Sequence, residues 1–515
     1  MPASARPPLP DRLLAFVQRD PYVLGITLLT AVVHLVVAGR YDIFRNELYF
    51  IVCGRHPAFS YVDQPPLVPL LAALTQVFGI HAWLLRLPAV LAATALVPVT
   101  ADFARRLGGN TPSAIFAAAS AALAPALIGI TTTTTTATFE PIAWTVCAYA
   151  LVRGILGGED RAFLWAGAVA GLAMEAKYGI AIWLLGLAAG ILLTQVRGVW
   201  LQRRIWYGFL LCVALALPSL LWQTAHHWPF LELILNKRHA GANFTGTPLR
   251  FEIGQILAVN LVLWPLWMTG VIAPFVSERF ARARFLSIAF VVATVIVFLT
   301  GGKDYYLFPV YPTMFAVGAA ACSEMRKWVI GVWLMAASAQ TLILLPVVLP
   351  ILDPPALASF LAATHLRPKP DEAAAVGAPL TQVFSDELGW RDLERRVASV
   401  YRSLPLDDQR RVAIFASNYG EAAAIDVYGR ADGLPAAISG QNQYYLWGSQ
   451  GYDGSVMILV NVRPERWQRF CRSIETADTF GVPYAMPYET DRPILLCRGL
   501  RANLSATWYR FKRYQ

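Results

Sequence analysis

Charged side chains are scarce in this sequence. They make up 15% of 515 residues, whereas soluble domains carry about 25%, and hydrophobic residues reach 56%. This composition excludes an ordinary soluble protein and indicates a protein that lies largely in a membrane.

Cysteine is also scarce, with no C-x-x-C spacing, which argues against a structural zinc or redox motif. The six cysteines are Cys53, Cys147, Cys212, Cys322, Cys471 and Cys497. Cys471 and Cys497 share the C-terminal region, and the sequence leaves open whether they form a disulfide or stay as two free thiols.

Apolar runs near the ~20 residues that cross a bilayer follow one another along the chain. Examples are Tyr22–Ala38, Ile256–Val276, Phe285–Thr300 and Val329–Leu352. A buried core helix explains one such run but not a long series. We expect about eleven spans, beginning near residues 22, 83, 113, 138, 163, 180, 206, 252, 285, 305 and 329. Residues 1–20 are polar, proline-rich and basic, so no cleaved signal is expected and the first span is retained.

The net charge of +10 does not indicate nucleic-acid binding, because the arginines do not form a stripe. They lie instead in short loops between apolar runs, at Arg105–Arg106, Arg153–Arg161, Arg197–Arg204, Arg279–Arg284 and Arg326–Lys327. If the N-terminus with Arg6, Arg12 and Arg19 is cytoplasmic, the positive-inside rule places all these loops on that side.

This topology exports three segments. The first, Tyr41–Ala82, contains two amphipathic stretches, Glu47–Cys53 and Leu67–Phe78, which we expect along the membrane surface. The second is Gln223–Phe251, with His226 and His227 as further loop candidates. The third is everything after Asp353.

The exported C-terminal segment has the pattern of a small soluble α/β domain. Strand-like Val412–Phe415 and Val456–Val462 alternate with helix-like Asp386–Leu404 and Glu465–Glu475. We therefore expect a polytopic α-helical membrane domain at 1–352 and an extracytoplasmic α/β domain at 353–515.

Polar residues interrupt the apolar pattern at five places that this topology brings to one membrane face. They are Asn46-Glu47, the Tyr61-to-Pro66 segment with Asp63 and Gln64, Glu140-Pro141, Lys177-Tyr178, and Lys303-Asp304-Tyr305-Tyr306. An ionisable residue in a span costs on the order of 2.5–3.5 kcal/mol on insertion scales, which makes it a functional candidate.

Each of these signals has a plain structural alternative. Glu47 fits a solvated loop carboxylate, and Glu140 followed by Pro141 fits a helix start. Lys177 fits a side chain that snorkels to the interface, and Lys303 fits a loop cation. Convergence on one face favours the functional interpretation.

The set suits transfer from a phosphate-linked donor held in the membrane. Cations hold the leaving phosphate and stabilise its growing charge, and a carboxylate accepts the proton of the attacking hydroxyl.

At these residues the chain resembles a known family. The order Asn46-Glu47-x-Tyr49-Phe50, Tyr61-x-Asp63-x-Pro65-Pro66, Glu140-Pro141, Lys177-Tyr178 and Lys303-x-Tyr305-Tyr306 resembles the bacterial protein-mannosyltransferase-like enzymes of the GT-C superfamily, which include aminoarabinose transferases acting on lipid A. The resemblance covers roughly residues 20–350. Residues 416–421, 438–442 and 445–448 also resemble the exported domain of some of these enzymes.

The resemblance implies roles for individual residues. Glu47 and Glu140 match acidic positions of the family, although Asn46 replaces its usual first aspartate, which weakens any metal site. Gln64 stands where relatives often have Lys or His. Lys177 matches a lysine near the lipid phosphate, and Tyr61 and Asp63 match residues lining the same cavity.

We therefore expect an inverting glycosyltransferase that moves a monosaccharide from a polyprenyl-phosphate donor to a lipid, glycan or protein acceptor outside the bacterial cytoplasmic membrane. Glu47 is the expected general base, followed by Glu140 and Asp63. The expected donor and phosphate site comprises Lys177, Lys303, Tyr61, Gln64, Tyr305 and Tyr306. A divalent cation stays open as a cofactor, and nucleic acid is not expected as a partner.

The alternative is a transporter or flippase of lipid-linked sugars, which also uses many spans and intramembrane charges. Against it, the charges gather at one face instead of the midplane, and no inverted repeat is visible. A third hypothesis, a glycan-binding module on a membrane anchor, does not explain so many spans.

Overall fold

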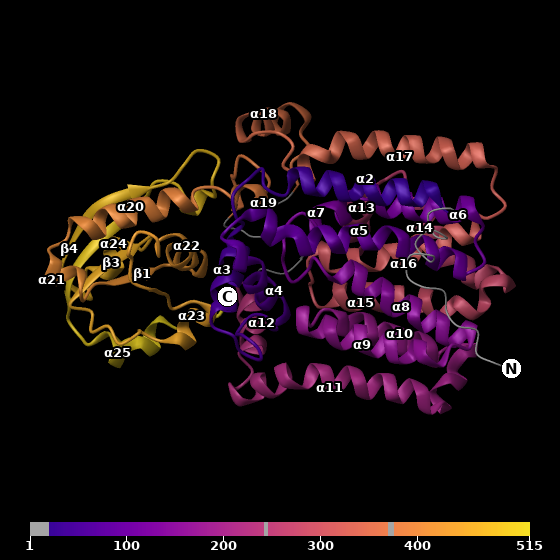
Figure 1. The fold of residues 1–515 in the computed structure, drawn as a ribbon, viewed down its shortest axis with the longest axis horizontal. Helices are drawn as coiled ribbons and strands as arrows, with labels where there is room; N and C mark the ends of the chain where they lie inside the picture. Colours follow the sequence, from indigo (N-terminus) through magenta and orange to yellow (C-terminus); the bar gives the residue numbers. More distant parts are fainter. Residues whose placement is uncertain (1–19, 241–245, 369–374) are drawn as a thin grey trace.

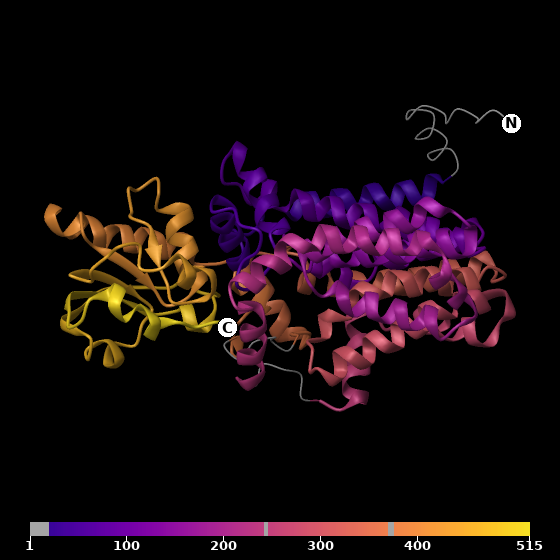
Figure 2. The same ribbon diagram turned by 90° about the horizontal axis from the view of Figure 1, so that it is seen from below.

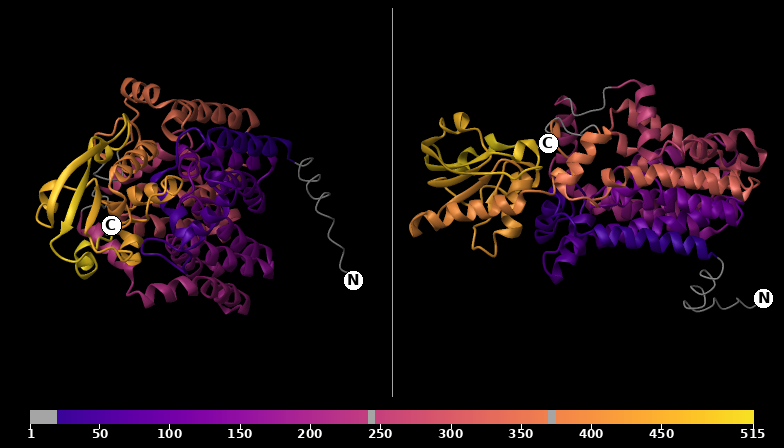
Figure 3. Two further views of the ribbon diagram at one scale, coloured as in Figure 1. Left: turned by 60° about the vertical axis from the view of Figure 1, so that its left-hand side comes forward. Right: turned by 90° about the horizontal axis from the view of Figure 1, so that it is seen from above.

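A computed structural model describes residues 20–240, 246–368 and 375–515. It consists of a bundle of helices and, beside one end of that bundle, a smaller part with a sheet (Figure 1). Figure 2 and the right-hand view of Figure 3 show the two parts following one another along the longest axis of the molecule.

The bundle contains a helix near each of the eleven expected positions. These helices are α2 (Pro21–Val37), α5 (Ala82–Arg106), α6 (Thr111–Ala122), α8 (Glu140–Gly157), α9 (Asp160–Ala176), α10 (Ile180–Leu192), α11 (Arg203–Ala225), α13 (Pro248–Val259), α15 (Arg284–Leu299), α16 (Tyr311–Ala321) and α17 (Lys327–Val348). Shorter segments of the bundle and its loops are α7 (Pro125–Ile130), η2 (Gln195–Leu201), α12 (Pro229–His239), α14 (Trp264–Val276), η3 (Glu278–Ala283), η4 (Asp304–Tyr306) and η5 (Phe308–Val310).

By length and composition, four described helices are able to cross a membrane, or up to six if each bent pair is one span. The bent pairs are α10 with η2 and α13 with α14. Large apolar side chains on the outside of the bundle, such as Leu210 and Leu342, are exposed, as expected of a surface that faces lipid. These are the features of a multi-pass membrane protein, whereas the count of eleven crossings stays a prediction.

The basic loops meet at the end of the bundle that lies away from the sheet. Arg106 contacts Glu159 at 2.6 Å, and Arg279 donates to the Gly108 carbonyl at 2.6 Å and to the Ser323 hydroxyl at 3.0 Å. The basic loops that we expected on one side of the membrane thus lie at the same end of the bundle. The expected cytoplasmic arginines of the N-terminus, Arg6, Arg12 and Arg19, lie outside the described residues.

The segment between α2 and α5 forms the junction with the smaller part. It contains α3 (Arg45–Arg55), α4 (Leu67–Thr75) and η1 (Gln76–Phe78). α4 and η1 expose Leu74 and Phe78, as expected of a helix at the membrane surface. The expectation for Glu47–Cys53 was wrong, because every one of these residues is buried, and α3 packs against a helix of the C-terminal part.

The C-terminal part has a five-stranded mixed sheet in the order β2-β1-β3-β5-β4. The strands are β1 (Ala413–Ala416), β2 (Ala437–Ile438), β3 (Val456–Val460), β4 (Cys471–Phe480) and β5 (Arg492–Leu500). β1 runs parallel to β2 and β3, whereas β5 runs antiparallel to β3 and β4. An α/β fold is therefore present, as expected.

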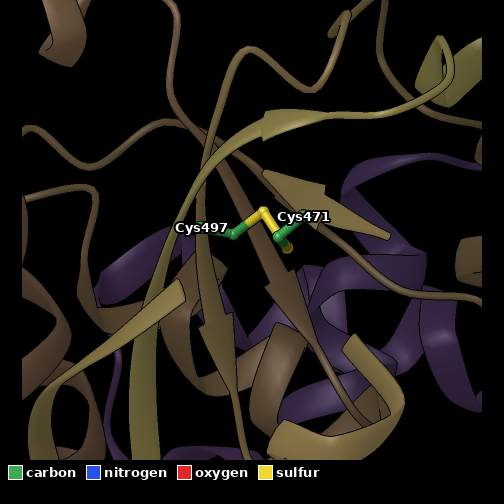
Figure 4. The surroundings of a disulfide bond; sticks show 2 residues. All are labelled: Cys471 and Cys497. Carbon is green, nitrogen blue, oxygen red and sulfur yellow. A yellow bond between two sulfur atoms is a disulfide. The ribbon is translucent and has the colours of Figure 1, made fainter. Parts of the chain in front are cut away.

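Helices surround this sheet and connect it to α17. They are α18 (Pro354–Thr364), α19 (Gln382–Ser385), α20 (Trp390–Ser403), α21 (Leu406–Gln409), α22 (Tyr419–Tyr428), α23 (Asn442–Trp447), α24 (Pro464–Trp467) and α25 (Leu504–Thr507), with 3-10 turns η7 (Pro487–Glu489) and η8 (Trp508–Phe511). The helix expected at Glu465–Glu475 was wrong. Only α24 is helical, because the chain from Cys471 onward pairs with β5 and Cys471 forms a disulfide with Cys497 (Figure 4).

Candidate active site

Lys177 and Glu140 form an ion pair at the end of the bundle that faces the C-terminal part. α9 ends at Ala176, and Lys177 continues in an extended conformation, which directs its side chain toward the start of α8. Lys177 Nζ lies 2.6 Å from Glu140 Oε2, and the side chains are 20% and 4% exposed. Gly179 makes this approach possible, since a Cβ there would lie 2.2 Å from Glu140 Oε1.

Two tyrosines complete this cluster. Lys177 Nζ lies 4.8 Å from the ring centroid of Tyr306 and 5.2 Å from that of Tyr305, both cation–π distances. The two rings come from η4, and Gln255 of α13 holds this turn by donating to the Asp304 carbonyl at 3.0 Å. Lys177 therefore presents its charge among a carboxylate and two aromatic rings. Lys303 lies half-buried just before η4.

The loop from Ser60 to Pro66 lies beside this cluster. Ser60 Oγ is 3.2 Å from the hydroxyl of Tyr178, the neighbour of Lys177. Gln223 of α11 donates to Ser60 Oγ at 3.0 Å and to the Tyr61 carbonyl at 2.8 Å. The sequence motifs at residues 61–66 and 177–178 are thus brought together as expected.

Asp63 is the half-buried carboxylate of this loop. It accepts hydrogen bonds from the Tyr49 hydroxyl at 2.9 Å and from Asn442 Nδ2 at 3.1 Å. Burial raises its pKa, although these two hydrogen bonds and the charge of Lys237 act in the opposite direction. A carboxylate with a raised pKa is a stronger base than a free aspartate.

Tyr61 and Gln64 point into the loop and do not line an open site. Tyr61 is fully buried, and its hydroxyl donates to the Cys53 carbonyl at 2.8 Å. The Gln64 side chain is also buried and lies 3.8 Å from Cys53 Sγ. We therefore assign both side chains to loop structure, in place of the donor contacts expected from the sequence.

Glu47 is completely buried in an ion cluster. Its oxygens accept from Arg86 Nη2 at 3.0 Å, from the Phe44 amide at 2.9 Å and from the Thr134 amide at 2.8 Å. Arg86 Nη2 also lies 3.0 Å from Glu387 Oε2. Because Glu47 is fully buried and paired with the Arg86 cation, this geometry does not suit the general base expected from the sequence.

Arg86 and Glu387 are site-supporting residues that the sequence reasoning missed. Arg86 is a single charge in an otherwise apolar helix start, a signal that could have identified it. Glu387 carried no such signal, because its partner is 301 residues away in sequence. One guanidinium faces two buried carboxylates here. Burial, partly offset by Arg86, raises the pKa of Glu387 to about 8.

The remaining candidates lie outside the Lys177 cluster. Asn46 accepts a hydrogen bond of 2.7 Å from the Tyr419 hydroxyl of the C-terminal part. His226 and His227 are exposed at the end of α11, where the His226 ring stacks on Trp222 at 3.9 Å. Within the described parts of the chain, no three His, Cys, Asp or Glu residues gather as a metal site. The candidate residues of the described chain therefore do not offer the set of ligands that a metal ion needs.

Comparison with known proteins identifies the fold. A family model for dolichyl-phosphate-mannose-protein mannosyltransferase matches residues 63–222. The apo structure of ArnT from Cupriavidus metallidurans is similar with a TM-score of 0.62 at 15% identity, covering 92% of this chain and 97% of that one. The fold is therefore that of ArnT.

The structure of the same ArnT bound to undecaprenyl phosphate is similar with a TM-score of 0.58 at 13% identity, covering 92% of this chain and 98% of that one. No curated protein matches the chain by sequence. The resemblance to GT-C enzymes such as the aminoarabinose transferases, expected from five short motifs, is confirmed.

Proposed function

We propose that this GT-C protein transfers a monosaccharide from a polyprenyl-phosphate donor to an acceptor on the external membrane face. The observation that carries the proposal is the Lys177 cluster, which combines a cation, a buried carboxylate and two aromatic rings at one end of an apolar bundle. An ArnT of the same fold binds undecaprenyl phosphate, which supports a donor of this class.

In the proposed reaction Lys177 binds the donor phosphate. The bond between the anomeric carbon and the phosphate oxygen breaks, and the leaving phosphate keeps the electron pair while Lys177 stabilises its charge. Tyr305 and Tyr306 fix the position of the ammonium group. Glu140 orients Lys177 before the donor arrives.

Asp63 is the proposed general base. It is more accessible than the fully buried Glu47 and the nearly buried Glu140, and its loop contacts the neighbour of Lys177. Asp63 takes the proton of the acceptor hydroxyl while the acceptor oxygen bonds to the anomeric carbon from the opposite side, so the configuration inverts. The proposal assigns no step to a metal ion.

Glu47 becomes a positioning residue in this proposal. Through Arg86 it connects α3, α5 and the Thr131–Thr136 turn with Glu387 of the C-terminal part. It thereby fixes the loop that carries Asp63 relative to α8, which begins with Glu140.

The disulfide supports an external location for the domain proposed at 353–515. Disulfides persist in oxidising compartments and are rare in the cytosol. Cys471 and Cys497 are paired in this domain, whereas Cys53, Cys147, Cys212 and Cys322 are free. With the basic loops at the far end of the bundle, the positive-inside rule gives the same orientation.

The decisive experiment incubates purified protein with a radiolabelled polyprenyl-phosphate sugar and an envelope extract that supplies acceptors. A glycosyltransferase releases polyprenyl phosphate and labels an acceptor. A transporter or flippase leaves the donor intact, which would overturn the proposal. Asp63→Asn serves as the matched inactive variant, because it keeps the size and one acceptor oxygen but removes the base.

A further inference from the structure

Two adjoining hollows, of about 640 and 840 Å³, lie in the C-terminal part at the carboxyl ends of its parallel strands. Ser417 follows β1, Gly440 follows β2 and Asn461 follows β3, and all three line a hollow. Open α/β sheets bind ligands in this place, and both volumes are typical of small-molecule sites, about 300–1,000 Å³.

The two hollows share Arg463 and Arg513 and are strongly basic. Their lining includes Arg463, Arg466, Arg469, Arg492, Arg510 and Arg513, and Glu465 has the one acidic side chain among the described lining residues. Within those residues no salt bridge reaches Arg463, Arg466 or Arg469. Clustered, unneutralised arginines in a concave surface concentrate anions.

The strand ends themselves are held in specific conformations. Asn461 adopts a positive φ of 53°, and its Nδ2 donates to Glu421 at 2.6 Å and to the Tyr488 carbonyl at 2.8 Å. Arg513 donates to the Ser417 carbonyl, while its buried Nε has no hydrogen-bond partner among the described residues. Constrained backbone and an unused buried donor are typical of binding sites.

The first of the two hollows, of about 640 Å³, also reaches the first external loop. Its lining includes Arg45 and Tyr419, and the Tyr419 hydroxyl donates to Asn46. Arg45 is held by Asp386 at 3.3 Å. A ligand bound here therefore has one end among the arginines and the other beside the segment that carries Asn46 and Glu47.

We propose that the two adjoining hollows together bind a phosphate ester carried by the acceptor and thereby select anionic acceptors. The guanidinium fork matches phosphate oxygens in paired hydrogen bonds, which favours phosphate over an uncharged glycan. The role as an acceptor site rests on the glycosyltransferase function proposed above, whereas the binding of phosphate esters does not depend on it.

The test measures binding of glucose 6-phosphate and glycerol 3-phosphate to the full-length protein in nanodiscs of zwitterionic lipid, by calorimetry without donor. Glucose is the uncharged probe. The variant is Arg463→Ala with Arg466→Ala, and the control is Arg410→Ala, an exposed arginine of the same domain outside the hollows.

We expect the double variant to weaken binding of a phosphate ester at least tenfold, with the control unchanged. Stronger binding of the sugar phosphate indicates a glycan acceptor, and stronger binding of glycerol phosphate indicates a lipid headgroup. Equal affinity of wild type and double variant for both probes would overturn the proposal. The proposal would also be overturned if the double variant bound both phosphate esters normally and lost only its association with phosphatidylglycerol vesicles. That result would show that the arginines form a membrane-facing surface.

The two proposals fail separately. If phosphate esters bind as expected but no donor is consumed, the phosphate-ester site is supported and the transferase function is refuted. If donor is consumed but Arg463 and Arg466 do not affect phosphate-ester binding, the transferase function is supported and the phosphate-ester site is refuted.

Discussion

Replacement of Lys177 tests the centre of the proposed site. In Lys177→Ala the donor phosphate loses a charge-assisted contact worth about 1.5–3 kcal/mol, which corresponds to roughly 10–150-fold in affinity. The true loss lies toward the upper end, because the variant leaves the Glu140 carboxylate, 4% exposed, facing the phosphate without its cation. Lys177→Arg keeps the charge and should lose less than tenfold.

Removal of a partner from a buried ion pair also destabilises the fold, by about 3–5 kcal/mol in fully buried cases. Lys177 is 20% exposed, so we expect a smaller loss. The double variant Lys177→Ala with Glu140→Gln separates folding from binding. It removes the unpaired charge and should regain stability, while the phosphate affinity stays low because the cation is still absent.

The assay measures the affinity of polyprenyl phosphate for each variant in nanodiscs, together with its melting temperature. Lys327→Ala, at the start of α17 and at the opposite end of the bundle, is the matched control. Wild-type affinity in Lys177→Ala would refute the reasoning and leave Lys177 as an interface residue. Low affinity in the control as well would show a non-specific charge effect.

Three further predictions concern the base, the buried cluster and the disulfide. Asp63→Asn should lower turnover more than a hundredfold and leave donor affinity unchanged, because acid–base catalysis contributes ~10²–10⁴ to the rate. Normal turnover would show that Asp63 is not the base and leave Glu47 or Glu140 as the candidate. The Glu387 pKa of about 8 lies above its usual value near 4.5, so its contribution to stability is complete below about pH 4.5 and is lost as pH rises through 8. Glu387→Gln should therefore flatten the fall of melting temperature between these pH values, and an unchanged pH profile would contradict a pKa raised by burial at Glu387. Cys471→Ser with Cys497→Ser opens a disulfide that spans 26 residues, which should cost about 3–4 kcal/mol in unfolding of the C-terminal part, and an unchanged urea midpoint for that part would contradict the prediction.

Local patterns in the sequence determined most of the bundle. Hydrophobic runs near membrane length place helices close to all eleven expected positions, because each span satisfies its own backbone hydrogen bonds and is readable without its neighbours. The polar residues that interrupt these runs also identified the Glu140 and Lys177 pair, because a charge near lipid stands out against apolar surroundings.

Only the tertiary structure decided the surroundings of the carboxylates in the first loop. Glu47 has the sequence context of an accessible base, but Arg86 and the Thr134 amide enclose it. The same holds for β4, where pairing with β5 overrode the helix expected from local pattern. A partner that lies tens or hundreds of residues away leaves no local signal, so burial and strand pairing at such positions depend on the assembled fold.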